Sequence, residues 1–400
     1  MISVSEARSR VLAAAPDPRT EIVMLKEAGG RTLSSPLTAR RTQPPSDVSA
    51  MDGYAVRSED FLKVPTRLSV IGEAPAGSPF NGTMGPGETV RIFTGGELPL
   101  GADTVILQED TERDGATAIF SELPVLGRHI RKAGLDFQVG DTIIPSGMVL
   151  TPRHLALAAS MNILWARVSR KPRVAILATG DEIRLPGDDI GPGQIIGSSG
   201  VGVASYVDQV GGEAILLDIA GDTEHQLTSA ARQAAGADIL VTLGGASVGD
   251  HDLVQQALTK EGLKVGFWKI AMRPGKPLMF GNLGEQIVLG LPGNPVSTMV
   301  CAILFLGPLI KRMLGQAETN PRTLPARLKT PIAPNDRRED YIRANLTLEE
   351  NGFEVEAFAI QDSSMMSVFA KSNCLIVRPP HMEAVPAGSV VDVLPLDIQF

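Results

Sequence analysis

The sequence predicts a multidomain α/β protein, in which a doubly wound, mainly parallel sheet domain carries an inserted all-β domain and is followed by a small C-terminal β-barrel. Three observations lead to this fold class. Strands and helices alternate in one long stretch of the chain, short strands cut by Gly and Pro precede that stretch, and similar short strands return after it. We expect a helical and extended linker domain (1–38 with 140–168), the inserted β domain (39–139), the α/β domain (169–316) and the barrel (317–400).

The linker domain is expected to begin with a helix. Val4, Ala7 and Val11 are spaced along one helical face, and this helix is a candidate to pack on the sheet domain. A second helix is expected after Thr151, which suits a helix cap, with Pro152 in the first turn.

The inserted domain is expected to be all-β because its apolar runs have strand length and are separated by turn clusters such as GSPFNGTMGPGE. The strand candidates are RLSVIGEA, TVRIFTGG, DTVILQED and ATAIF.

The α/β domain shows strands alternating with helices, which indicates a parallel sheet covered on both faces. The expected strands are RVAILATG, EAILLDIA, ADILVTLGG, KVGFWKIA and EQIVLGL, and the expected helices are 200–210, 224–235, 252–260 and a long one over 295–314. In such sheets ligands bind beyond the carboxyl ends of the strands. The loops expected there are ATGDE, LGGASVGDHD, RPGKP and LPGNP.

The composition argues against some classes of function. The 400 residues are 43% hydrophobic and 20% charged, with a formal net charge of -8, so the chain has no overall basic field for nucleic acid or an anionic membrane. The N-terminus MISVSEARSR has no apolar core, and we expect a cytoplasmic protein. Cys301 and Cys374 show neither a disulfide framework nor metal spacing, so both are expected to be buried and reduced.

Two backbone-rich loops predict an anion cradle. The segment WKIAMRPGKP carries Lys269, Arg273 and Lys276, and one short strand separates it from LGLPGNPVS. Glycines allow a ligand to approach the main chain closely, as polyanion-binding loops require. The glycines expected to do so are Gly275, Gly290 and Gly293. An ordinary solvated charged face is the alternative, and confinement between prolines and glycines favours binding.

Acidic residues in two other strand-end loops have two readings. In ATGDE, Asp181 and Glu182 suit a helix start or a divalent cation, and the helix reading is favoured when the loop is taken alone. In LGGASVGDHD, the carboxylates of Asp250 and Asp252 could complement a helix dipole, or could join the Ser247 hydroxyl in binding a phosphate and its Mg²⁺. The histidines show no ligand pairing.

Two loops of the inserted domain are further candidates for functional loops. PPSDVSAMDGYAV contains Asp52 before a glycine, where turn chemistry is the simpler interpretation. The segment IFTGGELPLGADTVILQED contains Thr94 and could be only a long hairpin.

Together these segments resemble the molybdopterin molybdenumtransferases, known as MoeA in bacteria and as the E domain of gephyrin in animals. The likeness covers nearly the whole chain and makes the α/β domain one of the molybdopterin-binding type. Seven motifs carry it in family order: PPSDVSAMDGYAV, FTGGELPLGADTV, GLDF, LATGDEI, LGGASVGDHD, AMRPGKP and GLPGNPVS.

The resemblance implies insertion of molybdate into adenylylated molybdopterin with release of AMP, assisted by Mg²⁺ at Glu182, Asp222 and Asp252. It also implies an elongated homodimer with the site in an intersubunit cleft, and a molybdopterin adenylyltransferase and apo-molybdoenzymes are expected as further partners. The catalytic residues implied are Asp52, Thr94, Asp136, Glu182, Asp222, Asp252, Lys269 and Lys276. The substrate-binding residues implied are Gly245, Ser247, Asp250, Arg273, Pro274, Gly275, Pro277, Pro292, Gly293, Asn294, Arg338, Arg343 and Ser367.

The chain departs from the family pattern at two places. Gly197-Ser198-Ser199 stands where many members have an Asp-Ser-Asn run, and Arg273 stands where a lysine is common. These departures keep a divergent or inactive paralogue as an alternative. A molybdopterin adenylyltransferase would lack the inserted β domain, and a scaffold protein would need partner-binding surface beyond the catalytic module.

Overall fold

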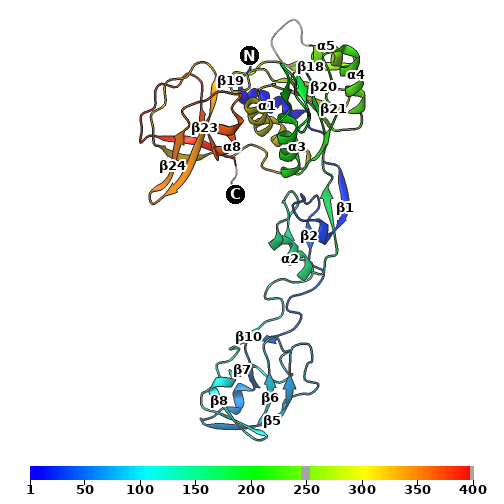
Figure 1. Ribbon diagram of the computed structural model, residues 1–400. Coiled ribbons are helices and arrows are strands. Elements are labelled where there is room, and N and C mark those ends of the chain that lie inside the picture. The colour runs from blue at the N-terminus through cyan, green and yellow to red at the C-terminus, as the bar shows by residue number, and fades with distance from the viewer. Residues whose placement is uncertain (245–252, 397–400) are drawn as a thin grey trace. The chain divides into compact units, whose positions relative to one another are not determined.

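A computed structural model describes residues 1–244 and 253–396, and the chain divides into two compact units. The sheet–barrel unit comprises Met1–Glu21, Gly30–Ser34 and the chain from Val168 onward. The insert unit comprises Ile22–Gly29 and Ser35–Arg167. Figure 1 labels their elements, and each unit is described by itself.

The sheet–barrel unit contains a six-stranded sheet in the order β16-β13-β17-β21-β20-β18. The first four strands are parallel, while β20 runs antiparallel to both β21 and β18. This confirms the predicted mainly parallel sheet. The strands are β13 (Arg173–Ala178), β16 (Glu213–Leu216), β17 (Ile239–Leu243), β18 (Leu263–Phe267), β20 (Met279–Leu283) and β21 (Gln286–Leu291).

Helices cover both faces of this sheet, as a doubly wound fold requires. Alternate residues of the central strands enter different cores: Ile176 packs with α3, α6, α7 and the N-terminal helix α1, whereas Leu177 packs with α4 and α5. The helices are α1 (Val4–Ala13), α3 (Ser199–Gln209), α4 (Glu224–Gln233), α5 (Leu253–Lys260), α6 (Pro295–Cys301) and α7 (Gly307–Met313). Because Val4, Ala7 and Val11 belong to the first core, α1 is part of the sheet packing.

The long helix expected over 295–314 forms one helical segment, Pro295–Met313, but it is not uniformly α-helical. A π-helical stretch, Ala302–Leu306, separates α6 from α7. Pro308 follows it and has no backbone N–H to donate, which accounts for a local change in the hydrogen-bond ladder. By length and composition this helix, Pro295–Met313, could cross a membrane, but 78% of its most apolar window is buried inside the protein.

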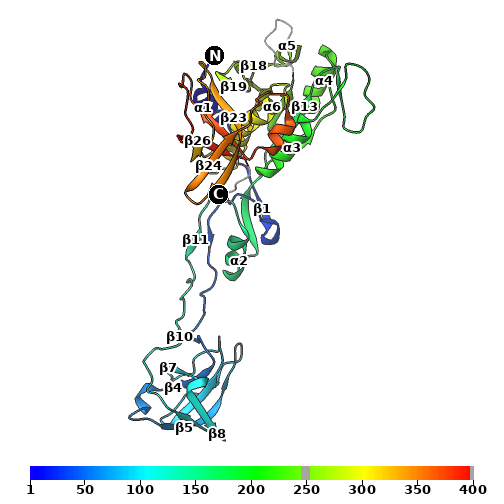
Figure 2. The same ribbon diagram turned by 60° about the vertical axis from the view of Figure 1, so that its left-hand side comes forward.

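The C-terminal part is a closed five-stranded barrel. The strands pair in the order β23-β24-β22-β26-β25, and β25 returns to pair with β23. Figure 2 labels β23, β24 and β26 of this barrel. Its strands are β22 (Leu324–Leu328), β23 (Glu339–Glu349), β24 (Gly352–Ala357), β25 (Cys374–Arg378) and β26 (Val390–Pro395), with helix α8 (Met366–Lys371) between β24 and β25. The loop 269–276, which carries Lys269, Arg273 and Lys276, is called the cationic loop. It contains a two-residue strand, β19 (Met272–Arg273), that pairs with the start of β23. The barrel prediction is confirmed, and its contact with the predicted anion cradle is a new feature.

The insert unit is built on a second six-stranded sheet, ordered β7-β4-β6-β5-β9-β8. Tyr54 and Phe120 contribute to one core and Val90 and Ile92 to another. The sheet strands are β4 (Gly53–Val56), β5 (Thr66–Ala74), β6 (Glu88–Ile92), β7 (Thr104–Leu107), β8 (Thr111–Asp114) and β9 (Thr117–Phe120). Thr151 is the N-cap of helix α2 (Pro152–Ser160), as predicted. Two strands, β1 (Thr20–Met24) and β12 (Trp165–Ser169), have residues in both units. The smaller strands of the insert unit are β2 (Leu37–Thr38), β3 (Val48–Ser49), β10 (Ile130–Arg131) and β11 (Thr142–Ile144). The remaining short elements are β14 (Ile183–Arg184) and β15 (Ile195–Ile196) of the sheet–barrel unit and the 3-10 turns Leu25–Glu27, Ser58–Asp60 and Gln108–Asp110 of the insert unit.

Candidate active site

The predicted strand-end loops meet at one edge of the sheet. The parallel strands β13, β17 and β21 end in register, with Ala178 beside Leu243 and Leu243 beside Leu291. Gly244 lies between the neighbouring loops at φ +92°, and a Cβ there would stand 3.1 Å from the Thr179 carbonyl oxygen. A Cβ on Gly293 would stand 3.6 Å from the Gly244 Cα. Glycine at position 244 therefore lets three loop backbones converge where a ligand is expected.

The cationic loop is closed by its own backbone and by the N-terminus. The Ile270 N–H donates to the Lys276 carbonyl at 3.0 Å, so Lys269 and Lys276 flank the neck of the loop. Ile2 lies alongside: its N–H donates to the Lys269 carbonyl at 3.3 Å and its carbonyl accepts from Ala271 at 2.9 Å. Neither lysine forms a salt bridge within the part of the chain that the structure describes. Their ammonium groups are therefore available to an anion.

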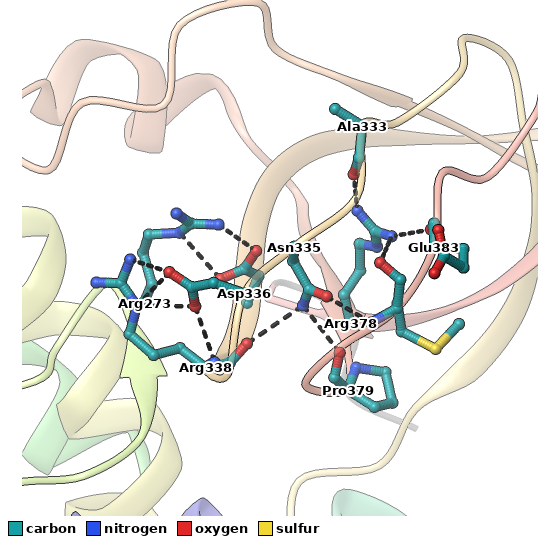
Figure 3. Close-up of polar contacts among 10 residues, drawn as sticks. Arg273, Ala333, Asn335, Asp336, Arg338, Arg378, Pro379 and Glu383 are labelled. Carbon is teal, nitrogen blue, oxygen red and sulfur yellow. Dashed lines mark hydrogen bonds and ion pairs between the residues drawn. The ribbon is translucent and has the colours of Figure 1, made fainter.

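Arg273 occupies a different setting, because it is paired with the barrel. Its Nε donates to Asp340 Oδ1 at 2.9 Å and its Nη2 to Asp340 Oδ2 at 2.5 Å. Figure 3 shows Arg273 close to Asp336 and Arg338 of the barrel loop. The predicted substrate-binding arginine is thus held by a carboxylate of the same unit, and its guanidinium has a fixed orientation.

The LPGNP loop is fastened to the helix that follows it and to the barrel. The Thr298 hydroxyl donates to the Pro292 carbonyl at 2.6 Å, and Asn294 Nδ2 donates to the Ser363 hydroxyl at 2.9 Å. Gly290 was expected to expose backbone to a ligand, but it is buried inside β21. A Cβ there would stand 3.0 Å from Met279 atoms, so this glycine serves close strand packing instead.

The carboxylates of the acidic loops differ in whether they form hydrogen bonds within the protein. Asp181 Oδ1 accepts the Asp222 backbone N–H at 3.0 Å, two residues before α4, which is itself capped by Thr223. The Glu182 carboxylate folds over Gly180, where a Cβ would stand 2.5 Å from Oε2. Among residues 1–244 and 253–396 no three His, Cys, Asp or Glu side chains form a metal-sized group. The residues Gly245, Ser247, Asp250 and Asp252, which are also predicted to belong to the site, lie outside the described residues.

The resemblance implies three substrate-binding residues in the barrel, and these differ in solvent exposure. Arg338 Nε donates to both Asp336 carboxylate oxygens at 3.1 Å, and these hydrogen bonds lower the pKa of Asp336 to about 2. Arg343 is only 2% exposed and donates to Gln361 and to a backbone carbonyl, while burial lowers the pKa of its guanidinium. Ser367 is exposed on α8. Arg338 and Ser367 face solvent more than Arg343 does.

The predicted residues of the insert unit form their own group. Asp52 Oδ1 accepts both the backbone N–H and the hydroxyl of Thr94, each at 2.7 Å, so Asp52 holds the neighbouring loop rather than only its own turn. These hydrogen bonds, followed by the charge of Arg91, hold the pKa of Asp52 below its ordinary value. Asp136 and Arg131 line a small open pocket of about 360 Å³ in the same unit.

Sequence reasoning missed Asp340 and Ile2. Asp340 is a buried carboxylate on a strand, and the only signal in the sequence is an acid at an inward-facing position of EDYIRA. Its partner Arg273 is 67 residues away, so the pairing needs the barrel register. Ile2 pairs through its backbone, which leaves no side-chain signal.

Comparison with known proteins agrees with this geometry. Residues 2–162 match the MoeA N-terminal region (domain I and II), residues 175–312 a probable molybdopterin binding domain, and residues 325–396 the MoeA C-terminal region (domain IV). Two curated relatives are named molybdopterin molybdenumtransferase. The one from Haemophilus influenzae is 37% identical over 99% of both chains, and the one from Nostoc is 36% identical over 95% of this chain and 89% of its own.

Solved structures lead to the same assignment. Two crystal structures of molybdopterin biosynthesis MoeA proteins from Pyrococcus horikoshii have TM-scores of 0.86 and 0.84, at 30% and 26% identity. Each covers 99% of this chain, and 99% and 100% of the solved chains are matched. The chain therefore belongs to the MoeA family of molybdopterin molybdenumtransferases and is an enzyme of molybdenum cofactor biosynthesis.

Proposed function

We propose that this enzyme inserts molybdate into adenylylated molybdopterin and releases AMP. The observation that carries the proposal is the cationic loop at the carboxyl edge of the sheet. Lys269 and Lys276 flank its neck without a salt bridge among the described residues, beside the converging backbones of Gly244 and Gly293. An edge with these features suits a ligand that carries phosphate and accepts a second oxyanion.

Charge repulsion is the main obstacle to such a reaction. Two unit charges of the same sign about 4 Å apart in a partly buried site repel each other by roughly 4 kcal/mol. Molybdate next to a pyrophosphate brings several such pairs of negative charges together. Fixed ammonium and guanidinium groups offset this repulsion without moving during the reaction. Lys269, Lys276 and Arg273 are the groups proposed for this role, and Ser247 is a proposed hydrogen-bond donor. Thr94 donates both its backbone N–H and its hydroxyl hydrogen to Asp52, so the role proposed for it is to hold that carboxylate. No covalent nucleophile is needed.

The proposal includes Mg²⁺ at Glu182 and Asp222, together with Asp252. Mg²⁺ commonly uses one or two protein carboxylates and completes its shell with substrate phosphates and water. Glu182 and Asp222 fit this pattern, since both are exposed and the Asp222 backbone is bonded to Asp181, the residue next to Glu182. When bound, the ion would stabilise negative charge on the departing AMP.

We also infer a cytoplasmic homodimer in which Asp52, Thr94 and Asp136 act on the substrate held by the other subunit. The resemblance supports this arrangement. An adenylyltransferase that delivers the substrate and apo-molybdoenzymes that accept the product are the proposed protein partners. Sedimentation velocity would test the dimer: a monomer at micromolar concentration would contradict it.

The direct test compares two lysine variants. Purified protein is mixed with adenylylated molybdopterin, Mg²⁺ and molybdate, and AMP release and reconstitution of an apo-molybdoenzyme are followed. Lys276→Ala is expected to lose both activities while keeping the wild-type unfolding midpoint. Lys264→Ala, which removes an exposed lysine from β18 of the same sheet, is the control and should retain both.

Each result has a defined meaning. Wild-type protein that binds substrate but releases no AMP would contradict the proposed reaction and favour a divergent paralogue. The first segment to examine would then be Gly197-Ser198-Ser199, where Gly197 donates its N–H to Arg184 and the serines begin α3. Full activity in Lys276→Ala would remove that lysine from the mechanism.

A further inference from the structure

We propose that Asp340 is a positioning residue for Arg273: it holds one edge of the guanidinium and turns the other edge toward an oxyanion. The inference rests on the proposed function of the same site and adds a residue that does not itself touch the ligand. It also gives a role to the arginine that stands where relatives of this type commonly have lysine.

The pairing is built into the strand register. Arg273 in β19 lies directly beside Asp340 in β23, and both carboxylate oxygens accept from the guanidinium, through Nε at 2.9 Å and Nη2 at 2.5 Å. The Asp340 side chain is 5% exposed, whereas that of Arg273 is 48% exposed. The carboxylate is therefore the buried anchor, and the guanidinium extends from it toward solvent.

Half of the guanidinium remains for a ligand. An arginine carries five N–H groups in a planar fork, and the two bonds to Asp340 use the edge formed by Nε and Nη2. Nη1 has no hydrogen-bond partner within the described part of the chain. The edge formed by Nη1 and Nη2 matches the spacing of two oxygens on a tetrahedral oxyanion.

Asp340 is not shared with the other arginine beside it. Arg378 of β25 is its register neighbour on the opposite side, but the Arg378 guanidinium donates to the carbonyls of Ala333, Met382 and Glu383 (Figure 3). Those carbonyls bind both Nη groups of Arg378, and its buried Nε has no hydrogen-bond partner among residues 1–244 and 253–396. Arg378 therefore interacts with Asp340 only through its charge, and the hydrogen bonds of the carboxylate go to Arg273. The result is a dedicated carboxylate–guanidinium pair at the point where the barrel touches the cationic loop.

A lysine at position 273 would behave differently. Its donors all lie on one nitrogen, so contact with Asp340 and contact with an anion draw on the same small group. An arginine separates the two functions on two edges of one plane, which share only Nη2. Replacement by lysine keeps the charge but removes the second edge.

The test measures binding of sodium molybdate to the full-length protein by isothermal titration calorimetry, with circular dichroism to verify folding. Asp340→Asn and Arg273→Lys are each expected to weaken binding at least tenfold. The double variant Asp340→Asn/Arg273→Ala should bind no more weakly than Arg273→Ala alone, because the carboxylate acts only through the arginine.

A matched control is available at the opposite edge of the same sheet. Asp238, whose side chain is 9% exposed, accepts from Arg170 Nη2 at 2.8 Å through both carboxylate oxygens. It precedes β17 and is remote from the carboxyl edge. Asp238→Asn breaks the same kind of buried pair and is expected to leave molybdate affinity within twofold of wild type.

The sign of the change separates the alternatives. If Asp340 acted only through its charge, Asp340→Asn would bind molybdate more tightly, since a nearby negative group is removed. If Asp340 were only structural, affinity would stay unchanged while the unfolding midpoint fell. Either result overturns the proposal, as does wild-type affinity in Arg273→Lys, which also decides the matter if Asp340→Asn fails to fold. Because molybdate binding is measured without turnover, failure of AMP release would contradict the proposed reaction alone.

Discussion

Gly275 offers a quantitative test of how the cationic loop is packed. Its φ is +109°, a region that residues with a Cβ rarely adopt, and an added Cβ would stand 2.6 Å from the Cys301 sulfur and 3.0 Å from Met272 Cε. Backbone strain of this kind costs about 1–3 kcal/mol. Forcing an extra methyl group into a packed core costs about 1–3 kcal/mol more. Gly275→Ala should therefore destabilise the sheet–barrel unit by about 2–6 kcal/mol, the sum of these two terms.

A double-mutant cycle separates the two contributions. Cys301→Ala removes the sulfur and should cost about 1 kcal/mol by itself, for the lost burial of one atom. In the double variant the clash with sulfur disappears, so the two changes together should cost about 1–3 kcal/mol less than their sum. Gly284→Ala is the control for strain alone, because Gly284 has φ +62° and nothing within 4 Å of an added Cβ. It should cost about 1 kcal/mol.

The assay is urea unfolding of each variant followed by far-ultraviolet circular dichroism. Gly275→Ala within about 0.5 kcal/mol of wild type would refute the packing argument, since variation of that size is usual for unimportant surface changes. Additive effects of Gly275→Ala and Cys301→Ala would show that the added methyl group does not meet the sulfur.

Three further predictions concern other parts of the sheet–barrel unit. Burial raises the pKa of both thiols, that of Cys374 to about 12, so Ellman's reagent should label Cys301 and Cys374 only after unfolding, and rapid labelling of native protein would contradict their burial. The pKa of Asp336 falls from 3.8 unfolded to about 2 folded, so its ion pair with Arg338 stabilises the fold above about pH 4 and is lost as the pH falls through about 2. Asp336→Asn should accordingly lose less stability than wild type between those values, measured by denaturant midpoints, and an equal loss would exclude this pair as the cause. Thr298→Val should cost about 1–2 kcal/mol in urea unfolding because a buried backbone carbonyl loses its donor, and a neutral effect would mean that the carbonyl finds another partner.

Most of the fold is predictable because periodicity reports directly on neighbouring layers. The alternation of strands and helices leads to a parallel sheet, and parallel strands bring Thr179, Gly244 and Pro292 to one edge whatever the details of the loops. The buried, free state of Cys301 and Cys374 also follows from their apolar surroundings, and it is confirmed.

Long-range pairing is what the sequence does not reveal. Asp52 suits a local turn, yet it accepts two hydrogen bonds from Thr94, which lies 42 residues away. The sequence suggests that Arg273 is an unpaired cation of the cationic loop. In the structure the β19–β23 register places Asp340 beside it. Neither contact has a sequence period, because each depends on how separate segments of a unit are assembled. The interruption of the long helix did have a local signal, the Gly307-Pro308 pair.

We expect an oxyanion to bind in the cationic loop at the carboxyl edge of the sheet. The most direct measurement is a crystal structure of the protein soaked with molybdate, with the molybdenum located by anomalous scattering. An anomalous peak is expected within contact distance of Lys269, Lys276 and the Nη1–Nη2 edge of the Arg273 guanidinium. A peak elsewhere, or none at concentrations that saturate binding in solution, would contradict this expectation.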